Sequence, residues 1–257
     1  MDQARHYICK SCMAPVPQGQ FCVRCGSQIP DEDLAVDTQY FSEMQDPAKA
    51  RLILIHGAGM EGLSYHLTGD EHIAGRSGSL EFDDKFISPT HANFYYRNTR
   101  LVVRDEGSLN GVYVRIRGGT DIAPGDVLLV GDQVLRLELT PKASDAGDAD
   151  GTLFYASPKR PTGFRVTQLL EGGVLGTTVC AASNTLIIGQ RDSDMNFIDD
   201  VHMDVHHCSI TETDGRFQVT DNNTRNGTYV RIKTEVELGH GDYVFMGRKL
   251  LRVELNA

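Results

Sequence analysis

The sequence lacks any apolar run that approaches the length of a membrane-spanning segment. Its first residues, MDQARHYICK, also lack the apolar core of a secretory signal peptide. We therefore expect a cytoplasmic chain that is not inserted in a membrane. Positive charge is scarce as well: 25 Lys and Arg residues stand against 35 Asp and Glu residues, which gives a net charge of −10. This balance argues against a general nucleic-acid binder, because such proteins need a positive field.

Four of the six cysteines lie within the first 25 residues, as the CxxC pairs Cys9 with Cys12 and Cys22 with Cys25. In a reducing compartment such pairs are typical of metal ligands and not of disulfides. Two knuckles that each give two thiolates complete a tetrahedral zinc site. The stretch resembles the short zinc ribbons at the N-termini of many bacterial signalling proteins. We predict one structural Zn²⁺ ion in a ribbon over residues 1–29.

The segments that join the ordered parts are polar. Residues 30–49 lose all hydrophobic periodicity and are acidic, which predicts a linker. Residues 141–162, rich in Ala, Asp, Gly, Ser and Pro, predict a second linker.

A repeat organises the rest of the chain. DEGSLNGVYVRI at 105–116 returns as DNNTRNGTYVRI at 221–232, an offset of 226 − 110 = 116 residues. Upstream the offset is 114, which aligns Gly75 with Gly189. A repeat this long indicates two copies of one domain and not a solenoid. We place the copies at 50–140 and 163–257.

Each copy is predicted to be all-β. Residues 135–139 and 251–255 alternate apolar and polar side chains with period two, and 100–104 and 216–220 have the character of further short strands. Turn signals recur every 8–12 residues or so, and no amphipathic helix of ordinary length is present. These features predict two β-sandwiches. The isolated cysteines, Cys180 and Cys208, are interpreted as small buried hydrophobes.

Two stretches imitate enzyme motifs. LILIHGAGMEG at 52–62 has the glycine spacing of a dinucleotide-binding loop, but the helix which that loop needs does not follow, so we interpret the glycines as a bend between strands. HMDVHH at 202–207 offers metal-ligand types, but the repeat aligns His207 with His91, and the first copy has no other histidine there. Since no nucleophile–base set or Walker loop occurs either, we expect no enzyme.

The first copy carries an ordered set of residues: Gly75-Arg76, Ser88 to His91, Asp105 to Ser108, Asn110-Gly111 and Pro124 to Asp126. This set resembles the forkhead-associated (FHA) domain, a β-sandwich that binds phosphothreonine peptides through loops at one end. The resemblance implies that Arg76 and Ser88 contact the phosphate and that Asn110 holds the peptide backbone. It also implies that Gly75, His91 and Gly111 shape the binding loops.

Physical chemistry agrees with those roles. A phosphate near neutral pH carries nearly two negative charges, and arginine meets it with charge-assisted, forked hydrogen bonds. The amide of Asn110 offers both a donor and an acceptor, which suits the grip on a peptide backbone. Pro89 and Leu109 depart from the polar residues that many family members have there, which predicts weaker affinity or an altered preference.

The second copy departs further from the family pattern. Gln190 stands at the position of Arg76, and Asp204 stands at the position of Ser88, while His207, Asn226 and Gly227 remain. A carboxylate near a phosphate opposes its binding. We therefore predict that the second copy does not bind phosphothreonine.

These inferences predict an adaptor in Ser/Thr-kinase signalling, whose first sandwich docks on a phosphothreonine-containing protein. The alternative is a structural assembly module in which neither sandwich reads phosphate. A further hypothesis concerns Thr38 in the acidic linker: some family members have a threonine in a similar tail that, once phosphorylated, folds back onto their own pocket.

Overall fold

The structure is a computed structural model that describes residues 6–9, 11–12, 15–17, 21–28, 49–56, 62–142, 147–155 and 163–255. The chain divides into two units, Met1–Asp46 and Pro47–Ala257. Thr38 and nearly all of the predicted 30–49 linker lie outside the described residues. Within the described ranges, no helix is long and apolar enough to cross a membrane.

The first unit contains a small antiparallel sheet of β1 (His6–Ile8) and β2 (Pro15–Pro17). A tight turn follows at the second cysteine pair, where the Cys22 N–H donates to the Ser27 carbonyl and the Gly26 N–H donates to the Cys22 carbonyl, both at 2.8 Å. Gly26 has φ 74°, a left-handed conformation that glycine adopts without steric cost.

The described part of the second unit is built from strands and one 3₁₀ turn, η3 (Glu171–Gly173). The first repeat contributes β3 (Ala50–His56), β4 (Ser64–His66), β5 (Glu71–Gly75), β6 (Leu80–Glu81), β7 (Ala92–Arg97), β8 (Arg100–Asp105), β9 (Val112–Arg115), β10 (Thr120–Ile122), β11 (Val127–Val130) and β12 (Gln133–Leu139). The second contributes β13 (Phe164–Leu169), β14 (Leu175–Cys180), β15 (Thr185–Gly189), β16 (Met195–Asn196), β17 (Cys208–Thr213), β18 (Arg216–Asp221), β19 (Thr228–Arg231), β20 (Val236–Glu237), β21 (Tyr243–Met246) and β22 (Lys249–Leu255).

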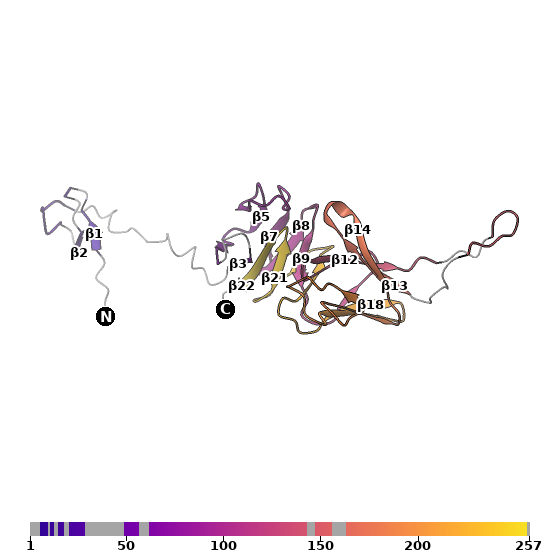
Figure 1. Cartoon of the computed structure of the whole chain (residues 1–257). Coiled ribbons are helices and arrows are strands. Elements are labelled where there is room, and N and C mark those ends of the chain that lie inside the picture. The colour runs from indigo at the N-terminus through magenta and orange to yellow at the C-terminus, as the bar shows by residue number, and fades with distance from the viewer. Residues whose placement is uncertain are drawn as a thin grey trace. The chain divides into compact units, whose positions relative to one another are not determined.

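Three sheets form the second unit (Figure 1). The largest has ten strands in the order β14-β13-β12-β11-β19-β9-β21-β22-β3-β4. Two five-stranded sheets, β20-β8-β7-β5-β6 and β10-β18-β17-β15-β16, complete the two sandwiches. The predicted all-β class and the two sandwiches are therefore confirmed, as are the strands expected around 100–104, 135–139, 216–220 and 251–255.

The two repeats exchange their C-terminal strands. In the first sandwich β9 pairs with β21, and β8 pairs with β20, although β20 and β21 belong to the second repeat. Conversely, β10 and β11 of the first repeat pair with β18 and β19 of the second. This is domain swapping within one chain. Each sandwich is therefore assembled from both repeats.

The exchange is centred on the twin motifs. Strands β9 and β19 pair antiparallel with Val114 opposite Val230, so the two YVRI segments lie side by side at the middle of the ten-stranded sheet. After β9 and β19 each repeat crosses to the other sandwich, and the two crossings make matching hydrogen bonds. The Ile116 N–H donates to Thr228 O and the Ile232 N–H donates to Val112 O, both at 2.9 Å. Such reciprocal contacts are characteristic of an isologous interface.

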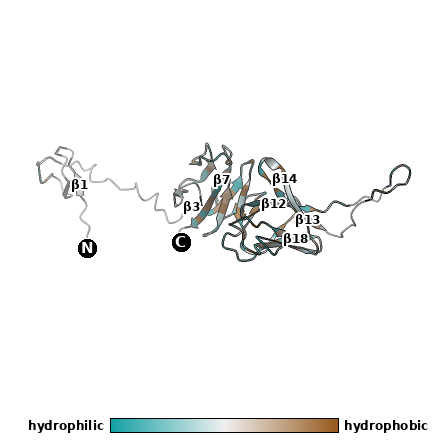
Figure 2. Cartoon of the chain, in the orientation of Figure 1, coloured by the Kyte–Doolittle hydropathy of each residue, from teal (hydrophilic) through white to brown (hydrophobic). Residues whose placement is uncertain are grey.

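Two hydrophobic cores follow the exchanged arrangement. Apolar and polar residues alternate along the strands, so one side of each strand faces a core (Figure 2). The first core joins residues 50–112 to Ile232, Leu238, Val244, Met246, Leu251 and Val253. The second joins residues 164–219 to Ile122, Leu128, Val130, Leu135 and Leu137.

A third cluster covers the opposite side of the sheet where the repeats meet. Tyr113, Leu129 and Tyr229 are buried there, because their neighbours Val114 and Val230 face the two cores. Burial raises the pKa of Tyr229 to about 12. The tyrosine of each twin motif is therefore buried where the two repeats meet.

Two local predictions have different outcomes. The sequence predicts a bend at the glycines of 57–62, of which 57–61 lie outside the described residues; β3 and β4, which precede and follow them, pair antiparallel. The burial expected of Cys208 is confirmed, but that of Cys180 is wrong. Cys180 ends the edge strand β14, and the alternation that packs Val179 on the core turns Cys180 outward.

Candidate functional site

The loop after β5 is held against the loop that precedes β7. A Cβ atom at Gly75 would clash with the carbonyl of Pro89, so only glycine fits at the end of β5. Beyond it, the Arg76 N–H donates to Ser88 O at 3.1 Å and the Ser77 N–H donates to Pro89 O at 3.0 Å. The close approach of these two loops places Arg76 beside Ser88.

The three predicted ligand-binding residues converge on the Phe86–Ser88 segment. The Arg76 Nε donates to Ile87 O at 2.7 Å. The Asn110 Nδ2 donates to Phe86 O at 2.7 Å, and the Leu109 N–H donates to Ser88 Oγ at 3.2 Å. Side chains from three separate parts of the sequence therefore share one short surface.

His91 joins the loops from beneath and is completely buried. Its Nδ1 accepts the Ser88 N–H at 3.0 Å, so this nitrogen carries no proton, and Nε2 then donates to Gly111 O at 3.0 Å. Burial lowers the His91 pKa, which keeps this neutral tautomer at physiological pH. One imidazole thus fixes Ser88 relative to the Asn110-Gly111 turn.

The turn itself passes from one sheet to the other, because β8 lies in a five-stranded sheet and β9 lies in the ten-stranded one. Gly111 has φ 85°, the positive value predicted for the residue after Asn110. Ser108 stabilises the turn: its N–H donates to Asp105 Oδ1 at 2.8 Å, and its Oγ accepts the Gly111 N–H at 3.0 Å.

The sequence alone assigned no role to three residues that contact this site, which are Asp84, Arg248 and Arg231. Asp84 is buried, accepts the Phe86 N–H at 2.9 Å and lies 3.5 Å from the guanidinium of Arg248. Arg231 approaches the turn from the second repeat. The sequence contains a signal for two of them, because Asp84 recurs as Asp200 and Arg231 recurs as Arg115 at the 116-residue offset.

Three basic side chains lie near Phe86, and one of them, Arg248, is paired with Asp84. Arg76 is exposed and forms no ion pair within the described part of the chain. Lys85 and Arg248 both lie over the Phe86 ring, at 4.9 and 5.0 Å from its centroid. An anion bound here would meet the unpaired Arg76 guanidinium with two further cations nearby.

The second repeat reproduces the main hydrogen bonds of this scaffold. His207 accepts the Asp204 N–H at 3.1 Å and contacts Gly227 O at 3.1 Å. Asn226 Nδ2 donates to His202 O at 2.8 Å, as Asn110 does to Phe86 O. Thr224 replaces Ser108, and its Oγ1 accepts the Gly227 N–H at 3.0 Å.

The two repeats differ most at the positions of Arg76 and Ser88. Gln190 is neutral and donates through Nε2 to Asp200 O at 3.1 Å. The Asp204 carboxylate takes the place of the Ser88 hydroxyl and accepts the Arg225 N–H at 3.3 Å. The second repeat therefore presents a negative charge where the first presents a hydroxyl beside an arginine.

The histidines of HMDVHH have separate partners. His207 is buried in the brace just described, His206 contacts Ser193 Oγ at 3.0 Å, and His202 lies 4.0 Å from Asp132. Among the described residues, the sole group of three or more potential ligands close enough to hold a metal is the N-terminal cysteine set.

That cysteine set matches the size of a zinc ion. The Sγ atoms of Cys9, Cys12, Cys22 and Cys25 all lie within 4.8 Å of one another. Cys9 and Cys25 are 3.6 Å apart and Cys12 and Cys22 are 3.8 Å apart, close to the ~3.8 Å edge of a tetrahedron with Zn–S bonds of about 2.3 Å. The backbone N–H groups of Cys12 and Ser11 lower the pKa of the Cys9 thiol to about 6, which favours the metal-binding thiolate.

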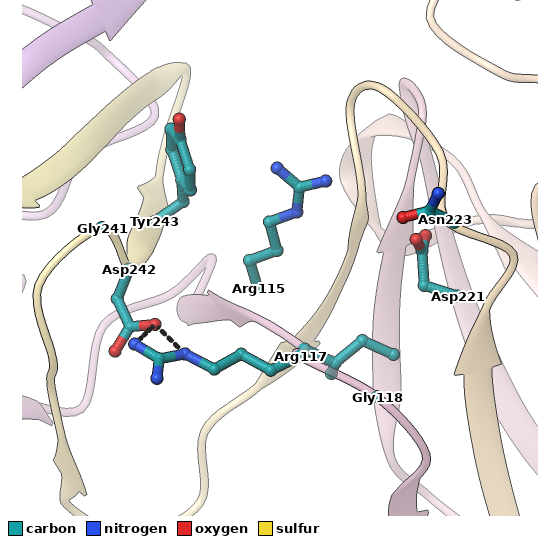
Figure 3. A pocket seen from close by; sticks show the side chains of 9 residues that line it. Arg115, Arg117, Gly118, Asp221, Asn223, Gly241, Asp242 and Tyr243 are labelled. Atoms are coloured by element: carbon teal, nitrogen blue, oxygen red, sulfur yellow. Dashed lines mark hydrogen bonds and ion pairs between the residues drawn. The ribbon is translucent and has the colours of Figure 1, made fainter.

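A polar cavity of about 350 Å³ lies at the junction of the repeats and not at the Arg76 site. Figure 3 shows Arg115 rising into it between Tyr243 and the loop that carries Asp221 and Asn223. At its floor, Arg117 forms an ion pair with Asp242 at 2.5 Å. This pair has a counterpart at the other crossing, where Lys233 lies 2.8 Å from Asp126.

Comparisons with solved structures found low-identity likenesses to FHA domains. A structure from a study of phosphothreonine-dependent FHA domain interactions is 11% identical (TM-score 0.32; 81% of this chain and 98% of that chain covered). The FHA domain of CT664 from Chlamydia trachomatis is 12% identical (TM-score 0.34; 81% and 99% covered). The FhaA FHA domain, in complex with the intracellular domain of Rv3910, is 11% identical (TM-score 0.31; 80% and 99% covered). No curated protein matches the sequence.

Comparison with protein families matches the FHA domain in both copies of the repeat. The match in the first copy contains Arg76, Ser88 and Asn110, and the match in the second contains their counterparts Gln190, Asp204 and Asn226. Residues 72–131 and 186–247 of this chain each match the FHA domain.

Proposed function

We propose that this protein is a phosphothreonine-dependent adaptor in Ser/Thr-kinase signalling. The first repeat reads the phosphorylated partner through Arg76, Ser88 and Asn110. The second repeat does not read phosphate and serves other contacts. The FHA matches in both repeats support a phosphopeptide-binding module in general, and the difference between the repeats rests on their side chains.

One observation carries the proposal: Arg76, Ser88 and Asn110 share the Phe86–Ser88 surface, and Arg76 has no carboxylate partner among the described residues. A phosphate placed there would receive a charge-assisted bond from the guanidinium and a short one from the hydroxyl. The amide of Asn110 lies next to it, where a bound peptide's backbone would run.

Substitution of Arg76 tests the proposal. We expect wild type to bind one phosphothreonine peptide per chain, selected from a peptide array and titrated by calorimetry. Arg76→Ala should weaken that binding by about 100-fold, since a hydrogen bond to a charged group contributes roughly 1.5–3 kcal/mol. Gln190→Ala, the matched change in the second repeat, should leave affinity and stoichiometry unchanged.

Two results would contradict this assignment. Equal binding of phosphorylated and unphosphorylated peptide by wild type would favour the alternative, an assembly module that does not read phosphate. A phosphate-dependent site that survives Arg76→Ala would instead move the reader to the second repeat or elsewhere.

We also propose that the cysteine set holds one structural Zn²⁺ ion that folds the N-terminal ribbon. Purified protein should contain close to one zinc per chain by elemental analysis, and Cys22→Ser should reduce this to well below half, because a three-thiolate site loses a ligand and its folding energy. Cys208→Ser, at a buried position far from these four in sequence, is the control. Two zinc ions per wild-type chain would contradict the single-site assignment.

A further inference from the structure

An arginine from the second repeat lies directly beneath the Asn110-Gly111 turn of the first. Arg231 ends β19, and its Nη2 donates to Ser108 O at 3.3 Å and lies 3.9 Å from Asp105 Oδ2. A Cβ atom at Gly111 would clash with the Arg231 guanidinium, so the two are in close contact. The guanidinium therefore binds both ends of the Asp105–Ser108 bend while it packs on the turn.

The same contact occurs in reverse at the other turn. Arg115 ends β9, and its Nη2 donates to Thr224 O at 3.0 Å, while a Cβ atom at Gly227 would clash with its side chain. Figure 3 shows Arg115 between Tyr243 and the segment that carries Asp221 and Asn223. The exchange of strands thus gives each Asn-Gly turn an arginine from the opposite repeat.

A second link runs to the other loop of the first site. The Arg248 N–H donates to Asp84 Oδ2 at 3.2 Å, and Asp84 in turn accepts the Phe86 N–H. Asp84 is nearly completely buried, so removal of its partners would leave a costly uncompensated charge. Both loops that present the ligand-facing side chains are therefore held by residues of the second repeat.

We propose that Arg231 is a positioning residue for the reader in the first repeat, an inference that rests on the function proposed above. Its side chain acts through Asn110: it hydrogen-bonds the Ser108 carbonyl before the turn, while His91 hydrogen-bonds the Gly111 carbonyl after it. Phosphopeptide affinity at Arg76 therefore depends on the second repeat, although that repeat has lost its own phosphate-binding residues. Arg115 performs the same structural task at a turn that does not read phosphate.

The symmetry supplies a matched control for the test, which uses the full chain. Arg231→Ala should weaken binding of the phosphothreonine peptide by about 10-fold, and Arg231→Lys should recover part of the loss, because an ammonium can reach one acceptor but cannot fork between two. Arg115→Ala should change peptide affinity by less than about twofold while it lowers thermal stability to a similar extent. Equal effects of the two alanine variants on peptide affinity would overturn the proposal.

Two further measurements separate positioning from a general effect of charge. In an Asn110→Ala background, Arg231→Ala should cause no additional loss, because both changes act on one interaction; additive losses would overturn the proposal. Hydrogen exchange should rise within 105–114 in Arg231→Ala and within 221–230 in Arg115→Ala. If wild type binds no phosphopeptide, the proposed function fails, whereas unchanged exchange at 105–114 would overturn the role of Arg231 by itself.

Discussion

We expect the two halves of the chain to stay bound to each other after the 141–162 linker is cut. The linker joins β12 and β13, which pair with each other, with Leu139 opposite Phe164. Cleavage of the linker leaves these hydrogen bonds between the two halves in place. Each half has its C-terminal strands in the core of the other sandwich. A protease site inserted in the linker allows the measurement by size-exclusion chromatography.

The buried surface explains why separation should not occur. Six side chains from 232–253 enter the first core and five from 122–137 enter the second, eleven in total. At about 1.5–3 kcal/mol for each fully buried side chain, their burial contributes on the order of 20 kcal/mol as an upper estimate. This exceeds the roughly 4–15 kcal/mol of entropy lost on association. The cut protein should therefore elute as one particle and dissociate only in denaturant.

A designed disulfide distinguishes exchanged strands from two complete sandwiches that merely adhere. Val102 pairs with Glu237 across β8 and β20. Cysteines at these two positions should crosslink the cut halves on a non-reducing gel, within the geometry that a disulfide requires. Asp121 is the counterpart of Glu237 in the first repeat, so Val102→Cys with Asp121→Cys is the control and should give no crosslink between halves. The opposite pattern, or halves that separate in buffer, would show that each repeat closes on itself.

The second large effect expected is a gained binding site. Gln190→Arg combined with Asp204→Ser should raise the number of phosphothreonine peptides bound per chain from one to two. The scaffold of the second site is intact, since His207, Asn226 and Thr224 make the same hydrogen bonds as their counterparts. What the wild-type second site lacks is a guanidinium and a hydroxyl, and the two substitutions introduce these groups.

Both changes are needed because the Asp204 charge opposes phosphate strongly. At about 5 Å and an effective dielectric constant of about 20, like unit charges repel by roughly 3 kcal/mol. Gln190→Arg alone should therefore add no second site, and the introduced arginine would pair with the carboxylate. Calorimetric stoichiometry is the readout, and Arg76→Ala in the double-variant background should leave one site. A folded double variant that still binds a single peptide would contradict this explanation of the second repeat.

Much of the candidate site was predictable because many of its residues have a local reason for their place. The Asn-Gly pair predicts the positive φ of Gly111, and the resemblance of the ordered set that begins with Gly75-Arg76 to the FHA domain predicts which loops meet. The counterparts of these residues follow from the repeat. The sequence therefore determines the local chemistry of both loop clusters.

The exchange was not predictable from the sequence, because the correct and incorrect partners are chemically equivalent. Strand β9 places Val112 and Val114 opposite Met246 and Val244. Its own repeat offers Val130 and Leu128 at the same positions, which instead pair with β19. Both choices bury aliphatic side chains in the same register, so periodicity and hydrophobicity cannot distinguish them. The choice depends on how the chain crosses after Ile116 and Ile232.

The reciprocal strands also affect how such a gene can change over time. Independent domains can be duplicated, lost or transferred to other genes at the linker between them. A break within 141–162 of this chain would instead leave each product without the strands that fill its sandwich and without the arginine beneath its Asn-Gly turn. If the second repeat does not read phosphate, as proposed, selection for the first site would still preserve its fold. The two copies are therefore expected to be inherited as a pair.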